Sequence, residues 1–301
     1  MSNVKVYSIL IFVMLLWGMN VSWLKMIISN GDPLTLQAIR IFLAAITVFV
    51  LLICLRQKIF VPNMPWKYII IACFFGTICH HAFLAYGIDK TMAMKTAIIS
   101  GLSPLFTALI AVLFKDTVMT WTKFIGFTLG GIGVLIAVVK DVTSLLELQL
   151  GDFFVFMSFF LQAFSFIAIR RGTYTISPLL MTGWMLLIGS LILLMFSIIV
   201  QPQSFVVVSN LSWGIWGILL LSAILATGIG HTLYNLSIKH IGAAESAIFT
   251  NFNTVFALLG ATLFLKEAIS IQQLIGCLFI VSGVIIGTGN VDSWLKIRRV
   301  S

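Results

Sequence analysis

The chain has 301 residues, of which 60% are hydrophobic and only 9% are charged, whereas about a quarter of the residues of a soluble domain are charged. Its net charge of +9 could indicate nucleic-acid binding, but basic residues in so apolar a chain (mean hydropathy +1.14) normally mark the cytoplasmic loops of a membrane protein. We therefore expect an integral membrane protein whose partners are the lipid bilayer and a small-molecule substrate, and no nucleic acid.

Apolar stretches of membrane-spanning length follow one another along the whole chain. A hydrocarbon core of about 30 Å requires roughly 20 helical residues. Windows of this length lie between charged and turn-forming clusters at residues 6–28, 34–55, 67–87, 92–114, 120–139, 152–170, 178–200, 212–238, 242–264 and 270–289. The first window is too long for a signal peptide and lacks a cleavage site, so we expect it to be retained. The sequence predicts an all-α integral membrane protein with ten transmembrane helices.

Lysine and arginine are distributed unequally between the two sides of the predicted membrane. If the N-terminus is cytoplasmic, the inner side holds twelve of the eighteen, the outer side holds five, and Arg40 lies within the second span. Positively charged loops are translocated poorly. Both termini are therefore predicted to be cytoplasmic, in a multi-pass protein of the cell membrane.

An internal repeat relates the two halves of the chain. A shift of 150 residues aligns the third to fifth spans with the eighth to tenth without a gap, and the matched pairs include Thr77 with Thr227, His81 with His231 and Gly133 with Gly283. Each half has five spans, an odd number, so the second half must enter the membrane from the opposite side. The prediction is two inverted five-helix repeats, residues 1–143 and 144–290, followed by a cytoplasmic tail, 291–301. Inverted repeats are typical of secondary transporters.

Four segments resemble the EamA-type family of the drug/metabolite transporter superfamily: "LLWGMN", "PLTLQAIRIFLAA", "SGLSPLFTALIAVLFKD" and "FNTVFALLGATLFLKEAIS". The resemblance covers essentially the whole chain, as two tandem EamA units, and implies a ten-span carrier of small metabolites such as amino acids, or of drugs, often outward. Two positions depart from the family pattern. Asp116 replaces the usual glutamate after the fourth span, and Thr254 replaces the usual proline of the ninth. The second departure removes an expected kink and argues against a symmetric bend of the fourth and ninth spans.

Polar side chains inside a span are costly, so each is a candidate for the substrate path. Two spans carry rows of such residues on one helical face: Thr96, Ser100, Ser103 and Thr107 in the fourth, and Ser246, Thr250 and Asn253 in the ninth. Each hydroxyl can instead bond to the carbonyl four residues earlier, which is a structural role. The amide of Asn253 cannot be satisfied in this way, so we expect the stripe as a whole to line a cavity.

His81 and His231 are repeat equivalents and are predicted to flank the middle of the membrane. Histidine titrates near neutral pH, so the pair could act as a proton-sensitive gate or as hydrogen-bond donors to substrate. The alternative, which we favour for each ring, is a neutral histidine bonded to a carbonyl. Further interior candidates for substrate binding are Trp17 and Asn20 in the first span, Gln162 in the sixth and Tyr234 in the eighth.

Lys95, Glu245 and Arg40 are the charged side chains considered as candidates for the substrate path or its mouths. Lys95 and Glu245 begin equivalent spans on opposite faces, where they could screen substrates at the two mouths or simply extend into water. Arg40 lies about 10 Å from Pro33 at 1.5 Å per residue, and its position matches the arginine typical of the family's second span. It could be structural, by extending to the interface or pairing with Asp32 or Asp89, or it could contact an anionic substrate group.

The fifth and tenth spans contain small-xxx-small patterns, "GFTLG" at 126–130 and "GVIIG" at 283–287, which favour close helix contact with each other or with a second protomer. The protein is therefore expected to be a monomer or a homodimer. No HExxH or Walker A sequence is present, the four cysteines lack metal-site spacing, and no loop could hold a receptor domain. The prediction is a secondary transporter that exports a small organic metabolite by alternating access, without enzymatic activity or cofactor. A passive channel or facilitator is the alternative.

Overall fold

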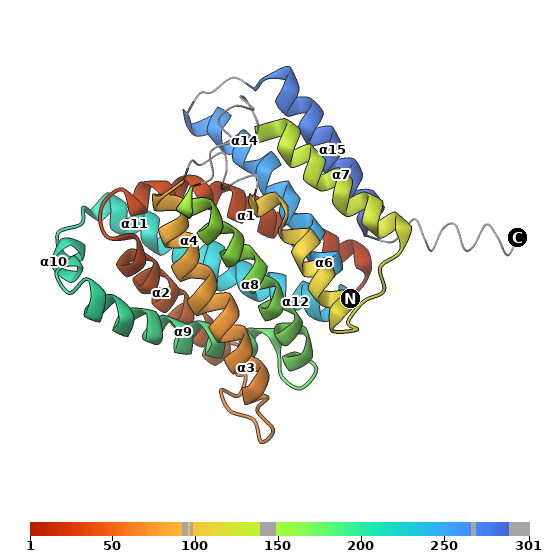
Figure 1. Cartoon of the computed structure of the whole chain (residues 1–301). Helices are drawn as coiled ribbons and strands as arrows, with labels where there is room; N and C mark the ends of the chain where they lie inside the picture. Colours follow the sequence, from red (N-terminus) through yellow and green to blue (C-terminus); the bar gives the residue numbers. More distant parts are fainter. Residues whose placement is uncertain (92–95, 97–98, 139–148, 266–268, 289–301) are drawn as a thin grey trace, which may run out of the picture.

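The computed structural model describes residues 1–91, 96, 99–138, 149–265 and 269–288 (Figure 1). Within these ranges all regular structure is helical and no strand occurs. The first half of the chain contains α1 (Asn3–Ile28), α2 (Pro33–Cys54), α3 (Trp66–Ala72), the π-helical segment η1 (Cys73–Cys79), α4 (His80–Asp89), α6 (Ser103–Leu113) and α7 (Trp121–Val138).

The second half repeats this order and adds one short surface helix. It contains α8 (Leu150–Gly172), α9 (Pro178–Val200), α10 (Ser204–Ser209), α11 (Trp213–Leu221), the π-helical η3 (Ser222–Ile229), α12 (Gly230–Ile241), α13 (Ala243–Ala247), the 3₁₀ segment η4 (Ile248–Asn251), α14 (Phe252–Leu265) and α15 (Ile271–Gly287).

Seven helical stretches of the described residues are long and apolar enough to cross a membrane: Asn3–Ile28, Pro33–Cys54, Trp66–Asp89, Trp121–Val138, Leu150–Gly172, Pro178–Val200 and Trp213–Ile241. They coincide with seven of the predicted spans. Two further predicted spans overlap the shorter apolar helices Ile99–Leu113 and Ile271–Gly287, and the predicted ninth span overlaps the consecutive elements α13, η4 and α14. The chain is thus an all-α membrane protein with several apolar spans.

Side-chain caps explain where several spans begin. The carboxylate of Asp32 accepts a 2.8 Å hydrogen bond from the backbone N–H of Thr35, and Pro33 opens the first turn of α2. Ser177 caps α9 in the same way, again with a proline in the first turn. A helix leaves its first N–H groups unpaired, and proline there removes a donor that has no acceptor. These short polar sequences therefore end the loops and set the register of the spans they precede.

The third and eighth spans each contain a π-helical segment at matching positions. A shift of 150 residues carries Cys79, the end of η1, onto Ile229, the end of η3. A π-helical turn widens the helix and is frequent at functional sites. Residues from the opposite half bond to carbonyls at both segments: the hydroxyl of Ser165 donates to Ala72 O at 3.2 Å, and the indole of Trp17 donates to Ala226 O at 2.8 Å.

The fourth and ninth spans are both interrupted, although Thr254 stands where a proline was expected in the ninth. The fourth span has a turn at Leu102 before α6 begins, with Pro104 in its first turn. The ninth changes from α13 to the 3₁₀ segment η4 and then to α14. Tertiary packing accompanies this irregularity, because a side chain at Gly130 of α7 would collide with the amide of Asn251 in η4.

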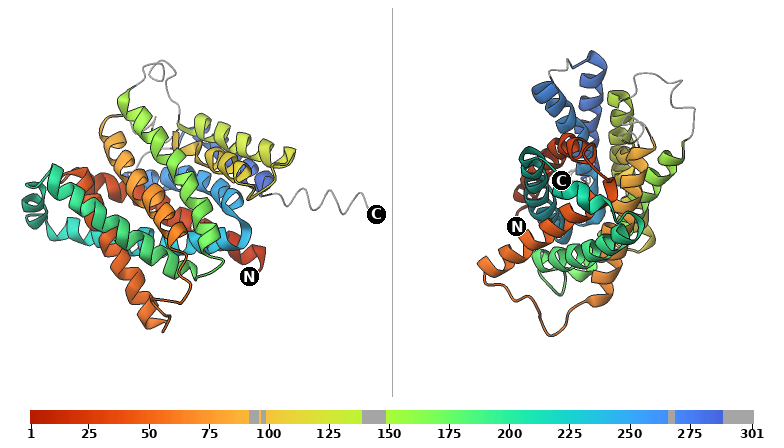
Figure 2. Two further views of the ribbon diagram at one scale, coloured as in Figure 1. Left: turned by 60° about the horizontal axis from the view of Figure 1, so that its bottom comes forward. Right: turned by 90° about the vertical axis from the view of Figure 1, so that its left-hand side faces the viewer.

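The helices of the two halves pack reciprocally. Helix α1 contacts η3, α12 and α14, and its counterpart α8 contacts η1, α4 and α6, while α2 lies along α9. Both views in Figure 2 show α7 (yellow-green) beside α15 (blue). Side chains at Gly126 or Gly133 would strike the backbone of α15, so glycine permits this close approach. The prediction that these two helices pack against each other is confirmed.

Candidate functional site

Arg40 lies deep in the protein, with 3% of its surface exposed. Its Nε donates to Gln37 Oε1 at 2.8 Å, and its Nη1 donates to Thr227 Oγ1 at 2.5 Å and to Ser222 Oγ at 3.4 Å. Of the two alternatives considered for Arg40, the structural one took Asp32 or Asp89, or the interface, as its partner, whereas the described partners are Gln37, Ser222 and Thr227. The face of α2 that carries Arg40 packs on η3, whose hydroxyls accept its hydrogen bonds.

A second hydrogen bond brings the first span into the same group. Ser222 Oγ donates to Asn20 Oδ1 at 2.5 Å, so Asn20 lies one residue away from Arg40 in the network. We call Asn20, Gln37, Arg40, Ser222 and Thr227 the Arg40 cluster. All five are buried, and both halves of the chain contribute to it. Removing a charge from water costs several kcal/mol even after relaxation, and here only neutral groups offset that cost.

Aromatic and imidazole rings form a second group in contact with η3. The Trp17 ring lies 5.0 Å from the rings of both His231 and Tyr234, measured between centroids. The His81 ring lies 6.4 Å from His231 and 4.8 Å from His80. We call these five residues the aromatic–histidine group. The two histidines matched by the repeat therefore lie near each other between the halves.

The polar atoms of this group are unequally satisfied. The Nδ1 of His80 lies 2.7 Å from Ser158 Oγ, which also donates to the backbone carbonyl of His80 at 3.0 Å. By contrast, both ring nitrogens of His81, the hydroxyl of Tyr234 and the hydroxyl of Thr77 are buried without a hydrogen-bond partner. The structural alternative, a histidine satisfied by its surroundings, thus fits His80 and does not fit His81. Unpartnered buried polar groups are uncommon, and a bound water or ligand is one explanation for them.

The predicted serine and threonine stripe does not join the Arg40 cluster. Thr107 Oγ1 donates to Ser103 O, four residues earlier, at 3.0 Å, which is the structural role considered from the sequence. Thr250 Oγ1 donates to Ala247 O, three residues earlier, at 2.7 Å. Asn253 Oδ1 is buried without a hydrogen-bond partner among the described residues, and the expectation that the stripe lines a cavity stays a prediction. Gln162 in α8 is buried, and Ser100 is partly buried.

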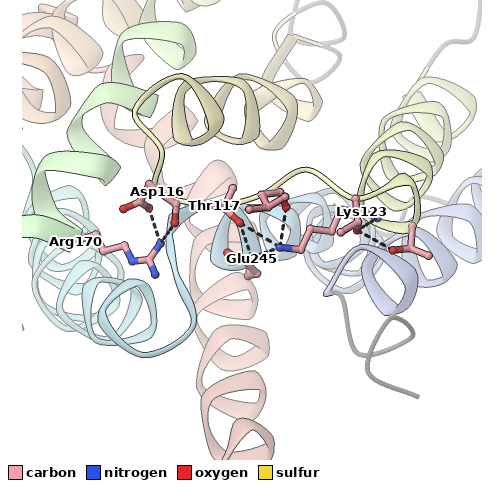
Figure 3. A network of polar contacts seen from close by, with 8 residues as sticks. Asp116, Thr117, Lys123, Arg170 and Glu245 are labelled. Carbon is pink, nitrogen blue, oxygen red and sulfur yellow. Dashed lines mark hydrogen bonds and ion pairs between the residues drawn. The ribbon is translucent and has the colours of Figure 1, made fainter. Parts of the chain in front are cut away.

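Glu245 is held in an ion pair, so the interpretation that it extends freely into water is wrong. Its Oε1 lies 2.6 Å from Lys123 Nζ and accepts a 3.1 Å hydrogen bond from Thr117 (Figure 3). Beside it, Arg170 Nη1 donates to the carboxylate of Asp116 at 2.5 Å and to its carbonyl at 2.8 Å. We call these five residues the mouth network. Lys95, the other predicted mouth residue, lies outside the described residues.

The mouth network connects the loop after α6 and the start of α7 to the end of α8 and to α13 (Figure 3). Gly242, between α12 and α13, has φ +104°, which glycine adopts without steric cost. A side chain there would meet Glu245 Oε2 and Arg170 Nη1. Gly242 therefore permits both the chain reversal and the close approach of these two charged groups. Asp116 makes this ion pair although its side chain is one methylene shorter than the glutamate that the sequence resemblance implied at this position.

Sequence reasoning missed several members of these groups. Gln37 precedes Arg40 by three residues on the same helical face, and Thr227 was a repeat match of Thr77, so both carried a signal that could have been used. Ser222 carried none, because its hydroxyl reaches Arg40 only through the packing of η3 on α2.

The family model of the EamA-like transporter family matches residues 4–139 and 149–288, which together cover nearly the whole chain. The chain belongs to this family. Similar proteins include the uncharacterized transporters YyaM and YoaV of Bacillus subtilis (strain 168). YyaM is 26% identical over 295 residues, covering 96% of this chain and 95% of its own, and YoaV is 27% identical over 290 residues, covering 95% and 97%.

A more distant relative is a Chlamydia trachomatis protein named as an S-adenosylmethionine/S-adenosylhomocysteine transporter. It is 24% identical over 253 residues, which cover 81% of this chain and 76% of that protein. A solved crystal structure matches the full length of both chains with a TM-score of 0.79 at 15% identity, which shows a shared fold alone. The names of the relatives support a transport function for this EamA-family membrane protein.

Proposed function

We propose that this chain is a secondary transporter that moves a small organic metabolite, amino acid-like or drug-like, out across the cell membrane by alternating access. The observation that carries this proposal is the family match to both halves, which the names of the transporter relatives support. The placement of the Arg40 cluster adds a physical reason. Its hydrogen bonds run from α1 and α2 of the first half to η3 of the second, so relative motion of the halves would alter the site.

The two ends of the molecule supply contacts that an opening motion would have to break. At one end the mouth network joins Lys123 of the first half to Glu245 of the second. At the other, the hydroxyl of Thr91 donates to the carboxylate of Asp152, near the start of α8. Partly exposed ion pairs contribute only about 0–1 kcal/mol. An ion pair of this strength can hold the end that carries the mouth network closed and still allow that end to open.

We propose further that the two halves are inverted in the membrane, with ten spans and both termini in the cytoplasm. The mouth network would then lie on the cytoplasmic side. Tyr7, near the start of α1, supports this assignment, because its ring lies 5.3 Å from Phe249, four residues after Glu245. The unequal distribution of lysine and arginine supports the same orientation.

Cysteine labelling tests this topology. With Cys54, Cys73, Cys79 and Cys277 replaced, a single cysteine is introduced at Lys90 or at His240, and intact cells are treated with a membrane-impermeant maleimide. Labelling at position 90 in intact cells, and at position 240 only after permeabilisation, supports inversion. Labelling of both positions from the same side overturns it.

The transport proposal is tested in two steps. Metabolites released by cells that overproduce the chain are first compared with those released by cells carrying the empty vector. A released compound is then loaded into proteoliposomes containing the full-length protein, and entry of its labelled form is followed. Saturable entry stimulated by the internal compound supports a carrier. Unsaturable entry without that stimulation indicates the facilitator. If the cells release no compound that the vector control lacks, the proposal is overturned.

A further inference from the structure

Arg40 is a buried cation that has no acidic partner among the described residues. Its acceptors are the side-chain amide of Gln37 and the hydroxyls of Ser222 and Thr227, all of which are neutral. Its second terminal nitrogen, Nη2, has no hydrogen-bond partner among the described residues. Arginine presents its donors in a planar fork that matches the two oxygens of a carboxylate. The Arg40 cluster uses only part of that fork.

The acidic residues that the structure describes all lie elsewhere, in helix caps, at a helix end or in the mouth network. Asp32 caps α2, Asp89 is the last residue of α4, and Asp152 lies in the capping turn of α8, while Asp116 and Glu245 belong to the mouth network. The titratable side chains of the neighbouring aromatic–histidine group are imidazoles instead: His231 follows Thr227 by four residues in the same span, and its ring lies 6.4 Å from that of His81. The centre therefore holds one fixed positive charge, neutral or basic neighbours, and no described carboxylate.

The groups beside Arg40 suit an organic molecule with an apolar or aromatic body. The ring of Trp17 contacts those of His231 and Tyr234, with its centroid 5.0 Å from each of theirs. The ring nitrogens of His81 and the hydroxyl of Tyr234 are buried polar atoms that still lack partners. A ligand that satisfied these atoms and Arg40 together would provide hydrogen-bond partners for several buried polar groups at once.

We propose that the transported metabolite carries a carboxylate and that Arg40 binds it, with the rest of the molecule against the aromatic–histidine group. This inference rests on the proposed transport function and names its substrate class. A single guanidinium balances a singly charged carboxylate, whereas a phosphate dianion would leave an uncompensated negative charge. A purely structural role for Arg40 explains its bonds to η3, but those neutral acceptors do not require a charged donor.

The decisive comparison uses the cell's own metabolites as the probe and sorts the released compounds by their charge at pH 7. Five strains are compared: empty vector, the native chain, Arg40→Gln, Arg40→Lys and, as a matched control at an exposed arginine outside the site, Arg56→Gln. Membrane level and detergent monodispersity are measured for each. We expect the released compounds to carry a carboxylate, and Arg40→Gln to lower their release roughly 10- to 100-fold, since a hydrogen-bonded charge is lost. Arg40→Lys should retain more of the native release than Arg40→Gln does, and Arg56→Gln should release as much as the native chain.

A second variant supplies the missing counter-charge from within the protein. Thr227→Asp places a carboxylate where Arg40 Nη1 now donates to a hydroxyl, so the arginine retains a partner and the fold is supported. The internal carboxylate should compete with that of the metabolite, and we expect at least a ~10-fold loss of release at a normal membrane level. Unchanged release by Thr227→Asp would overturn the inference.

The outcomes separate this inference from the proposed function. If no compound distinguishes the native chain from the vector, the transport proposal fails and the inference fails with it. If compounds are released but lack a carboxylate, transport stands and the inference is overturned, without reference to any variant. If carboxylates are released equally by the native chain and by a well-folded Arg40→Gln, Arg40 does not bind them.

Discussion

Nη1 of Arg40 donates a 2.5 Å hydrogen bond to Oγ1 of Thr227, which joins the second span of the first half to the π-helical segment of the second half. Both groups are buried, with 3% and 1% of their surfaces exposed. The bond therefore connects the halves at a depth where water cannot replace it, and its loss should affect the fold and the site together.

Thr227→Val removes this acceptor while keeping the shape of the side chain. We expect the free energy of unfolding to fall by about 1.5–3 kcal/mol, the range for a hydrogen bond to a charged group. The remaining contact of Nη1, with Ser222 at 3.4 Å, is too long to compensate fully. The measurement is the thermal or denaturant-induced unfolding of the purified chain in detergent.

Thr232→Val is the matched control for that experiment. Thr232 lies in the following helix, α12, and its hydroxyl donates only to Gly228 O of its own span at 2.8 Å. Removing so local a bond should cost less than removing the one to Arg40. Equal losses of unfolding free energy in the two variants would show that the Arg40–Thr227 bond contributes no more to stability than a bond within one span.

Trp17 allows hydrogen bonding to be separated from ring contact. Trp17→Phe removes the 2.8 Å bond to Ala226 O but keeps a ring against His231 and Tyr234. We expect a loss of about 0.5–1.5 kcal/mol in unfolding free energy, together with a changed rate of metabolite release, because this ring contacts the proposed site.

Trp184→Phe serves as the comparison, since its indole also donates to a backbone carbonyl, Ile59 O at 3.0 Å, within a separate aromatic group. The two variants should lose similar stability, but only Trp17→Phe should change release. A parallel change of release in both would assign the effect to stability alone.

The sequence predicted the scaffold better than the contacts within the site. Apolar windows marked the spans, and the repeat singled out His81 and His231, whose rings lie 6.4 Å apart. Those features can be recognised from composition and residue spacing, because membrane thickness sets the length of apolar windows and helix geometry sets the spacing. The partners of Arg40 depend on something else: a π-helical turn in η3 and the packing of α2 on it.

The same limit explains the error over Glu245. From its place at the start of a span, extension into water was the simplest expectation. Its partner Lys123 lies 122 residues earlier, and no local spacing relates the two. The 3₁₀ segment of the ninth span likewise has no local sequence signal, because it accompanies packing against α7 and no proline. Tertiary contacts decided each case.

The ion pair between Lys123 and Glu245 should hold one end of the molecule shut. Glu245→Gln and Lys123→Gln each remove one charge, and we expect either to favour opening by about 0.5–1 kcal/mol, the scale of a partly exposed ion pair. The reporter is a cysteine introduced at the buried Ser246 in a background without native cysteines. Its modification by a maleimide in inside-out vesicles should become about 2- to 5-fold faster.

The exchanged pair, Lys123→Glu with Glu245→Lys, controls for local effects on that reporter. It restores opposite charges at the two positions and should return labelling toward the native rate, so the coupling energy between the sites is measurable. If the exchanged pair labels as fast as the single variants, the ion pair does not govern opening.

Gly126 of α7 gives the sharpest prediction about stability. A methyl group there would meet the backbone nitrogen and Cα of Gly287 in α15 and the carbonyl of Gly283, and backbone atoms cannot move aside as a flexible side chain can. We expect Gly126→Ala to separate the two helices and to lower the free energy of unfolding by about 1–3 kcal/mol, the cost of overpacking a close interface.

Gly131 lies in the same helix, and a methyl group there would have only Leu105 Cδ1 nearby, at 4.0 Å. Gly131→Ala should therefore be neutral or stabilising by up to about 1 kcal/mol, since alanine loses less conformational freedom than glycine in a helix. Unfolding of both purified variants in detergent measures the difference. If Gly126→Ala unfolds no more easily than Gly131→Ala, close contact between α7 and α15 does not hold these helices together.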